Sequence, residues 1–160
     1  MLTADMVLRL LQLQPHPKEG GFFREMYRSA EGLPTRRSLA TAIYYLLTPE
    51  TFSEMHMLPG DEIFHFYLGD PVEMLHLHPD GSGQTVLLGT DLVAGMRPQV
   101  VVSGGVWQGS RLLPGGKFAL LGTTMAPGFD YADYVAGRRQ ELLARWPNFA
   151  AQITALTHAE

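Results

Sequence analysis

The sequence of 160 residues contains no cysteine. This absence excludes disulfide bonds, thiolate nucleophiles and every cysteine-based metal or iron–sulfur site. Basic residues are also few, since 12 Lys and Arg stand against 16 Asp and Glu and leave a formal net charge of −4. A protein that follows nucleic-acid phosphates needs a basic patch, so this balance argues against a nucleic-acid partner.

Long apolar runs are missing as well. None approaches the ~20 residues that span a bilayer, and residues 1–11 lack the basic leader and cleavage pattern of a signal peptide. We therefore expect a soluble, cytoplasmic protein with no membrane partner. The hydrophobic share of 46% is enough for one sizeable core, and the length predicts a single domain over residues 1–160.

Glycine and proline, by contrast, are frequent and divide the chain into short apolar segments. The 17 Gly and 11 Pro lie scattered in a way that is typical of strands joined by turns. No crossover helix is expected between residues 21 and 125, so the pattern favours an all-β barrel or sandwich over a parallel sheet. The expected strands include Leu39–Leu47, Glu62–Leu68, Val72–His78, Gln84–Leu88, Val100–Val102, Val106–Leu112 and Phe118–Met125.

Helices are expected only near the two ends. Apolar residues recur every three or four positions over residues 3–14 and predict a short amphipathic helix. A second helix is expected from near Asp130, which can cap it, to about Trp146. A third, short helix is expected over Phe149–Leu156.

A carboxylate at the start of an apolar strand is the most informative feature. His56 closes one strand, a Pro-Gly-Asp turn follows, and Glu62 opens the next, on the same face as Phe64 and Phe66. Burying Glu62 without a partner is costly or raises its pKa. A metal, a ligand hydroxyl or a donor such as His56 should therefore satisfy it, unless it lies in water at the strand mouth.

A second polar candidate follows the Gly104-Gly105 turn. A hairpin at this turn can place Gln108 inside the barrel, opposite His56 and Glu62. The spacing resembles the two cupin motifs, in which a histidine stands six residues before the glutamate and another follows a glycine-containing turn. Gln108 occupies the place of that last histidine.

Several longer segments resemble one small family, known as cupin 5, over nearly the whole chain. The resemblance implies a double-stranded β-helix barrel, a homodimer and no settled reaction. The segments are GGFFREMYRS (20–29), TAIYYLL (41–47), DEIFHFYLGDP (61–71), VWQGSR (106–111) and APGFDYADY (126–134).

The departures from the general cupin pattern bear on the cofactor. Leu58 stands where the motif has its second histidine, and Gln108 replaces the third. A neutral amide oxygen is a poor ligand for zinc or iron(II). We therefore expect either no cofactor or a weakly bound divalent metal on His56, Glu62 and Gln108.

Two further groups have competing interpretations. His76 and His78 share a strand face and could form a metal pair, but without a third ligand nearby exposed strand-end histidines are the favoured reading. Strict alternation places Phe23, Glu25 and Tyr27 on one face, where they belong either to a solvated edge strand or to a pocket mouth.

The first of three functional hypotheses is a metal-independent isomerase or epimerase acting on a carbohydrate-like substrate. Barrels similar to the deoxysugar epimerases use a histidine base and a tyrosine acid. By this resemblance His56 is the base, Glu62 orients it, and Tyr45 or Tyr27 returns the proton.

The other two hypotheses use the same pocket differently. One is a metal-dependent oxygenase or lyase that binds its metal weakly through His56, Glu62 and Gln108. The other is a non-catalytic module that holds a small polar metabolite. In each case the expected ligand-binding residues are Phe23, Glu25, Tyr27, Phe64 and Gln108.

Overall fold

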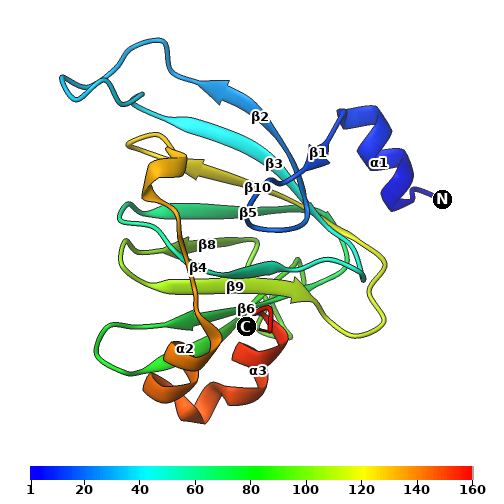
Figure 1. Ribbon diagram of the computed structural model, residues 1–160. Helices are drawn as coiled ribbons and strands as arrows, with labels where there is room; N and C mark the ends of the chain where they lie inside the picture. Colours follow the sequence, from blue (N-terminus) through cyan, green and yellow to red (C-terminus); the bar gives the residue numbers. More distant parts are fainter. Residues whose placement is uncertain (160) are drawn as a thin grey trace.

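A computed structural model describes residues 1–159, which form two antiparallel sheets facing each other, with helices near the two ends of the chain (Figure 1). The first sheet has the order β1-β2-β3-β10-β5-β8 and the second the order β11-β4-β9-β6-β7. The strands are β1 (Gln14–Pro15), β2 (Phe22–Arg28), β3 (Thr41–Leu47), β4 (Ser53–Met57), β5 (Glu62–Gly69), β6 (Val72–Leu77), β7 (Gly83–Leu88), β8 (Gln99–Val102), β9 (Trp107–Leu112), β10 (Ala119–Met125) and β11 (Val135–Ala136). The expected all-β architecture is confirmed.

Apolar side chains from both sheets meet in the barrel interior. Alternation along each strand decides which side chains enter it. On β6, Val72 and Met74 join the interior core, whereas Leu75 and Leu77 belong to a separate cluster beneath the C-terminal helices. Strands that are apolar on both faces thus bury both.

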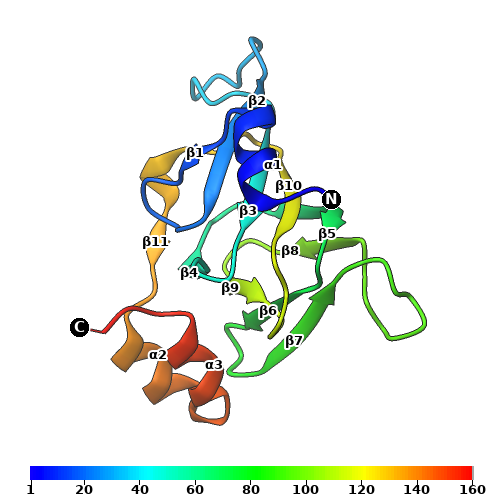
Figure 2. The same cartoon turned by 90° about the vertical axis from the view of Figure 1, so that its right-hand side faces the viewer.

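Short helices cover parts of the outer faces of the two sheets. Helix α1 (Ala4–Leu11) packs on Leu46 and Leu120 of the first sheet, while α2 (Arg139–Arg145) and α3 (Ala150–Ala155) pack on the second. Figure 2 shows α1 beside the upper strands and α2 and α3 below the lower ones. No helix in residues 1–159 is long and apolar enough to cross a membrane.

The helix predicted from Asp130 to Trp146 is wrong in its first half. Asp130 does act as a cap, because its Oδ1 accepts from the Ala132 amide at 2.9 Å, but it caps only a 3-10 turn, η1 (Tyr131–Asp133). The chain then becomes β11, which pairs with β4, and the Gly137 amide donates to Met55 O. These ladder bonds satisfy the backbone in place of helical ones.

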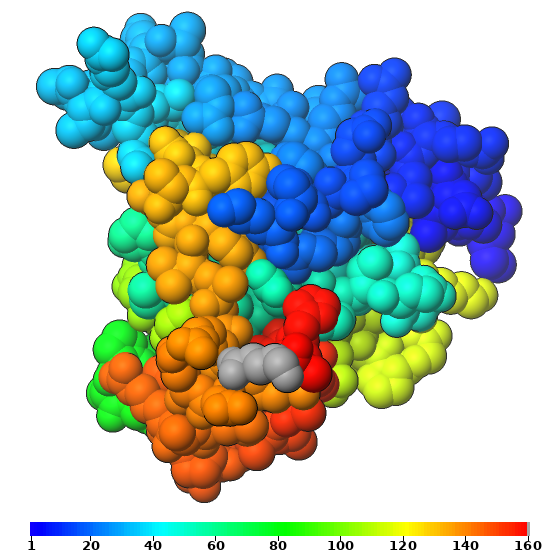
Figure 3. Space-filling view, viewed as in Figure 1, coloured from blue at the N-terminus to red at the C-terminus, as the bar shows by residue number. Residues whose placement is uncertain are grey.

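Residues 126–137, which we call the strap, therefore cross the front of the barrel. The strap appears as the orange band between the blue N-terminal segment and the C-terminal helices in Figure 3. An ion pair between Arg37 and Asp133, with 2.5 Å between Nη1 and Oδ2, ties it to the loop joining β2 and β3. The C-terminal part of the expected helix survives as α2, and a second 3-10 turn, η2 (Pro147–Phe149), leads into α3.

Candidate functional site

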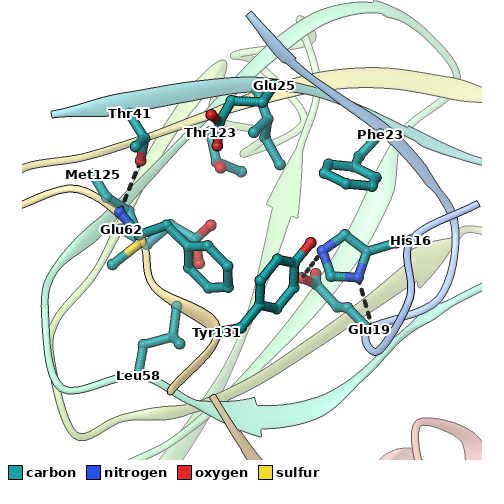
Figure 4. A pocket seen from close by; sticks show the side chains of 12 residues that line it. His16, Glu19, Phe23, Glu25, Thr41, Leu58, Glu62, Thr123, Met125 and Tyr131 are labelled. Carbon is teal, nitrogen blue, oxygen red and sulfur yellow. Dashed lines mark hydrogen bonds and ion pairs between the residues drawn. The ribbon is translucent and has the colours of Figure 1, made fainter. Parts of the chain in front are cut away.

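A small cavity of about 40 Å³ opens between β2, β3, β5 and β10 of the first sheet, the strap and the segment after β1 (Figure 4). This volume holds about three water molecules. Its walls combine acidic and aromatic side chains with a few apolar and hydroxyl groups. The lining residues are His16, Glu19, Phe23, Glu25, Thr41, Ile43, Leu58, Glu62, Thr123, Met125, Phe129 and Tyr131.

Glu62 is the innermost of the predicted site residues that reach this cavity. It opens β5 and is only 6% exposed, so the alternative of a wet carboxylate at the strand mouth is excluded. The buried Gln108 on β9 donates from Nε2 to Glu62 Oε2 at 2.8 Å, as the hairpin pattern predicts. Burial, followed by the negative charge of Glu19, raises the pKa of Glu62 to about 7.

His56 lies beside Gln108, because β4 and β9 pair these two residues. Its Nδ1 is 2.7 Å from the Glu54 carbonyl oxygen, which can only accept, so the ring proton is on Nδ1 and Nε2 keeps its lone pair. The ring stacks on Tyr134 of the strap at 5.0 Å between centroids. Burial lowers the pKa of His56, which favours the neutral imidazole.

Glu19 is a cavity residue that the sequence analysis missed. It lies in the segment after β1, where its Oε1 accepts from Ser53 Oγ at 2.5 Å. Burial raises the pKa of Glu19 to about 7. The cavity therefore contains two carboxyl groups that titrate near neutral pH.

His16 precedes Glu19 in the same segment and was missed as well. Its Nδ1 accepts from the backbone amides of Lys18 (3.3 Å) and Glu19 (2.9 Å), so the ring can hold its proton only on Nε2. Burial, followed by the charge of His56, lowers the pKa of His16 to about 4. The Gly20-Gly21 pair was the available signal, because both residues have positive φ angles and allow the segment to double back.

Five predicted site residues are not among those that line the cavity, namely His56 and Gln108, described above, and Tyr27, Tyr45 and Phe64. Phe64 is buried in the barrel core, and the Tyr45 hydroxyl donates to Gly20 O at 2.7 Å behind the cavity wall. Tyr27 is 56% exposed. The prediction that Tyr27 shares a face with Phe23 and Glu25 is wrong, because a β-bulge between Glu25 and Tyr27 places Tyr27 opposite Ala42 and ends the alternation.

The reading of His76 as an exposed strand-end residue is also wrong. His76 is 3% exposed and lies on β6 next to Gln108 of β9, so His56, Gln108 and His76 form a row across the second sheet. Its Nε2 is buried without a hydrogen-bond partner. Burial lowers the pKa of His76 to about 4. His78, at the end of the strand, is only partly buried.

The donor set does not fit a tightly bound metal. Within residues 1–159 there is no group of three or more His, Cys, Asp or Glu placed to hold an ion. Gln108 turns its NH₂ group, rather than its oxygen, toward Glu62. Leu58, in place of the second motif histidine, contributes an apolar side chain to the cavity. We therefore derive no step through a metal.

Comparisons with known proteins agree with this fold. The chain is 30% identical to the uncharacterized protein YML079W of Saccharomyces cerevisiae, over 91% of this chain and 81% of the yeast protein. Protein SO0799 of Shewanella oneidensis has a solved structure with a TM-score of 0.94 and 36% identity, covering both chains completely. A hypothetical protein from Leishmania major gives a TM-score of 0.91 with 30% identity, over 99% of this chain and 100% of that one.

A more distant likeness is to oxalate decarboxylase of Bacillus subtilis. Its TM-score is 0.58 with 14% identity, over 94% of this chain and 39% of that chain, so the likeness concerns the fold alone. Mn(II) centres are described for that decarboxylase. Residues 5–136 match the family model described as Cupin superfamily (DUF985). The chain is therefore a cupin barrel and belongs to the DUF985 family of the cupin superfamily.

Proposed function

We propose that this protein is a metal-independent acid–base enzyme that moves a proton on a small, polyhydroxylated, carbohydrate-like metabolite. The observation that carries the proposal is the pair of buried carboxyl groups, Glu19 and Glu62, which line one cavity and have pKa values of about 7. A general acid or base works best when its pKa is near the working pH. Buried carboxyl groups of this kind cluster at catalytic sites.

Mutual repulsion divides the roles between the two carboxyl groups. When one is ionised, its charge disfavours ionisation of the other, so near neutral pH the pair holds about one proton. In our proposal the ionised Glu62 removes a proton from a carbon next to a substrate carbonyl. The protonated Glu19 returns a proton to the substrate, and the pair ends the cycle with the same total charge.

The roles predicted from the sequence change in this proposal. Tyr45, predicted as the acid, donates its proton to Gly20 O and so holds the segment that carries Glu19. His56, predicted as the base, is not among the cavity-lining residues. Its Nε2 lone pair still makes it the alternative base, and the pH profile of the Glu62 variant distinguishes the two.

Exchange with heavy water tests the proposal without a known substrate. The protein is incubated in D₂O with a panel of aldoses, ketoses, amino sugars and hydroxy acids, and deuterium at carbon is measured by mass spectrometry. We expect wash-in of deuterium for at least one compound. Glu62→Gln should slow it by about 10²-fold or more, whereas Glu141→Gln on the exposed surface of α2 should leave it unchanged.

Two outcomes contradict this function. Full exchange by Glu62→Gln would remove Glu62 from the chemistry and, if His56→Gln were inactive, assign the base to His56. Tight binding of a panel compound with no exchange would make the protein a non-catalytic binding module. The rate is also expected to be unaffected by EDTA, and a loss that added manganese restores would favour a metal-dependent enzyme.

A further inference from the structure

We propose that the cavity recognises a protonated amine, so that the metabolite enters with an amino-bearing end. The inference rests on the proposed function, because it names the chemical class of ligand for the same cavity. It follows from the charge, the aromatic walls and the size of the cavity.

The cavity walls carry acidic side chains without basic ones to balance them. Glu19, Glu25 and Glu62 line it, and none of the lining residues in the described part of the chain is Lys or Arg. Glu25 is already neutralised by Arg28, whose Nε and Nη2 donate to its two oxygens at 2.9 and 2.8 Å. Glu19 and Glu62 have no such guanidinium partner among residues 1–159.

The neighbouring histidines do not supply the missing positive charge. His16 accepts two backbone N–H bonds on Nδ1, and a proton at that atom would break both. His56 is buried and its pKa is lowered. The cavity therefore carries a net negative charge at any pH at which its carboxyl groups are ionised.

Glu62 also presents a buried carboxyl group to the cavity. Figure 4 shows its carboxyl group turned toward the cavity. Its hydrogen-bond donors carry no charge: Gln108 donates to Oε2 at 2.8 Å, and a hydrogen bond from the Thr123 hydroxyl, like that from Gln108, lowers the pKa of Glu62. An ionised carboxylate 94% buried is costly unless a cation or strong donors compensate it. A bound ammonium group provides both.

The aromatic walls suit a cation as well. Phe23, Phe129 and Tyr131 present rings to the cavity. The ammonium of Lys18, which is outside the lining set, lies 6.0 Å from the ring centroid of the lining residue Tyr131 and 5.8 Å from that of Tyr134. Rings at this distance attract a positive charge through their negative faces, so one face of the entrance already contacts an ammonium group.

The volume limits how much of the ligand enters. About 40 Å³ accepts roughly three or four non-hydrogen atoms, which is enough for an aminoethyl group but not for a sugar ring. We therefore expect an amino group and an adjacent hydroxyl-bearing carbon to enter the cavity that Glu19 and Glu62 line, with the rest of the metabolite outside.

Three probes of matched size test the charge requirement: ethanolammonium, neutral ethylene glycol and anionic glycolate. Their dissociation constants are measured by NMR titration of the protein above pH 7. We expect ethanolammonium to bind about tenfold more tightly than ethylene glycol, and glycolate not to bind. Calorimetry in buffers of different ionisation enthalpy should show release of a fraction of a proton, because a cation favours ionisation of the pair without removing the one proton that Glu19 returns in the proposed reaction.

The affinity for ethanolammonium should fall as the pH drops below about 7, where Glu19 and Glu62 take up protons. Several other titratable groups surround the two carboxyls, and among them the charge of Glu54 also raises the pKa of Glu19. They are His16, Glu25, Tyr45, Glu54, His56, Tyr131 and Tyr134.

Variants separate recognition of charge from a change of structure. Glu19→Gln should weaken ethanolammonium about tenfold and leave ethylene glycol unchanged, and Tyr131→Ala should weaken ethanolammonium independently. Glu141→Gln is the control, since its exposed carboxylate pairs with Arg138 on α2.

The proposal would be overturned if ethylene glycol or glycolate bound as tightly as ethanolammonium or more tightly. It would also be overturned if Glu19→Gln left the affinity for ethanolammonium unchanged, or if none of the three probes bound. If neutral polyols exchange deuterium in a Glu62-dependent manner without a preference for amines, the proposed acid–base function is supported and the proposed recognition of an amine is wrong. If ethanolammonium binds as expected and no compound exchanges deuterium, the proposed recognition of an amine is supported and the proposed enzymatic function is wrong.

Discussion

At the scale of single residues, the carboxyl groups of Glu19 and Glu62 are buried at a cost to stability. Each folded-state pKa lies near 7 against an ordinary value of 4.5. A carboxyl with a raised pKa binds its proton more tightly in the folded state. Its contribution to stability is full below about pH 4.5 and disappears as the pH rises through about 7.

His16 and His76 have the opposite effect. Their pKa values are lowered to about 4, so the folded state disfavours the proton that the unfolded chain accepts near pH 6.5. Their contribution is present above about pH 6.5 and is lost as the pH falls toward 4. The two trends oppose each other in the wild-type protein, so only a difference between variants isolates the carboxyl group.

The variant Glu62→Gln should isolate the contribution of the Glu62 carboxyl group to stability. Its amide cannot ionise, and the histidines are unchanged. Relative to wild type, the variant should gain about 2 kcal/mol of unfolding free energy between about pH 5 and pH 7.5, at about 1.36 kcal/mol per pKa unit. Urea denaturation at several pH values measures the difference. A pH-independent difference would show that Glu62 does not titrate in this range.

At the level of elements, two neighbouring turns align the strands that carry Glu62 and Gln108. The Gly104 amide donates to Asp61 Oδ1 at 2.8 Å, and the Gly105 amide donates to Leu58 O at 2.8 Å. The turn before β5 is thereby bonded to the turn before β9. The Glu62–Gln108 hydrogen bond depends on this contact.

Gly104→Ala should disturb the alignment. A Cβ at residue 104 would lie 2.2 Å from the Pro59 carbonyl oxygen, a backbone atom that cannot move aside easily. We expect a loss of about 1–3 kcal/mol in urea denaturation, as for other overpacked sites, and weaker ligand binding. Gly60→Ala is the control, since Gly60, like Gly104, has no positive φ, and its new Cβ would meet only the Met125 Cε at an ordinary 3.5 Å. Equal losses in both variants would contradict the steric account.

The whole molecule leaves one part of the first sheet uncovered. Helix α1 packs on β3 and β10, but Tyr67 of β5 and Val101 of β8 remain exposed, Val101 by 54%. A homodimer was predicted from the resemblance to the cupin 5 family. We propose that this uncovered face of β5 and β8 forms its interface, because exposed apolar residues on a sheet face are typical of association sites.

Val101→Glu should convert the dimer to a monomer, since it places a carboxylate in the centre of the proposed apolar contact. Sedimentation at micromolar protein measures the oligomeric state. Val93→Glu is the matched control, because Val93 is fully exposed in the loop between β7 and β8. A monomeric wild type, or a Val101→Glu variant that remains dimeric, would contradict this interface.

Much of the fold could be predicted from the chain alone. Turn residues and short β-branched segments placed seven strands within a few residues of their observed ends, since these signals are local. The segment after Asp130 could not be assigned in this way. Its cap pattern favours a helix, and only pairing of β11 with β4 makes the extended backbone preferable.

The sequence by itself determined the barrel and marked Glu62, Gln108, Phe23 and Glu25 as candidate site residues, because strand alternation and motif spacing are features of neighbouring residues; the burial of Glu62 was left open. Only the tertiary structure decided the rest of the cavity. Glu19 and His16 reach it from a segment that doubles back through two left-handed glycines, and a β-bulge turns Tyr27 away. Contacts of this kind depend on chain segments far apart in sequence, and no local pattern records them.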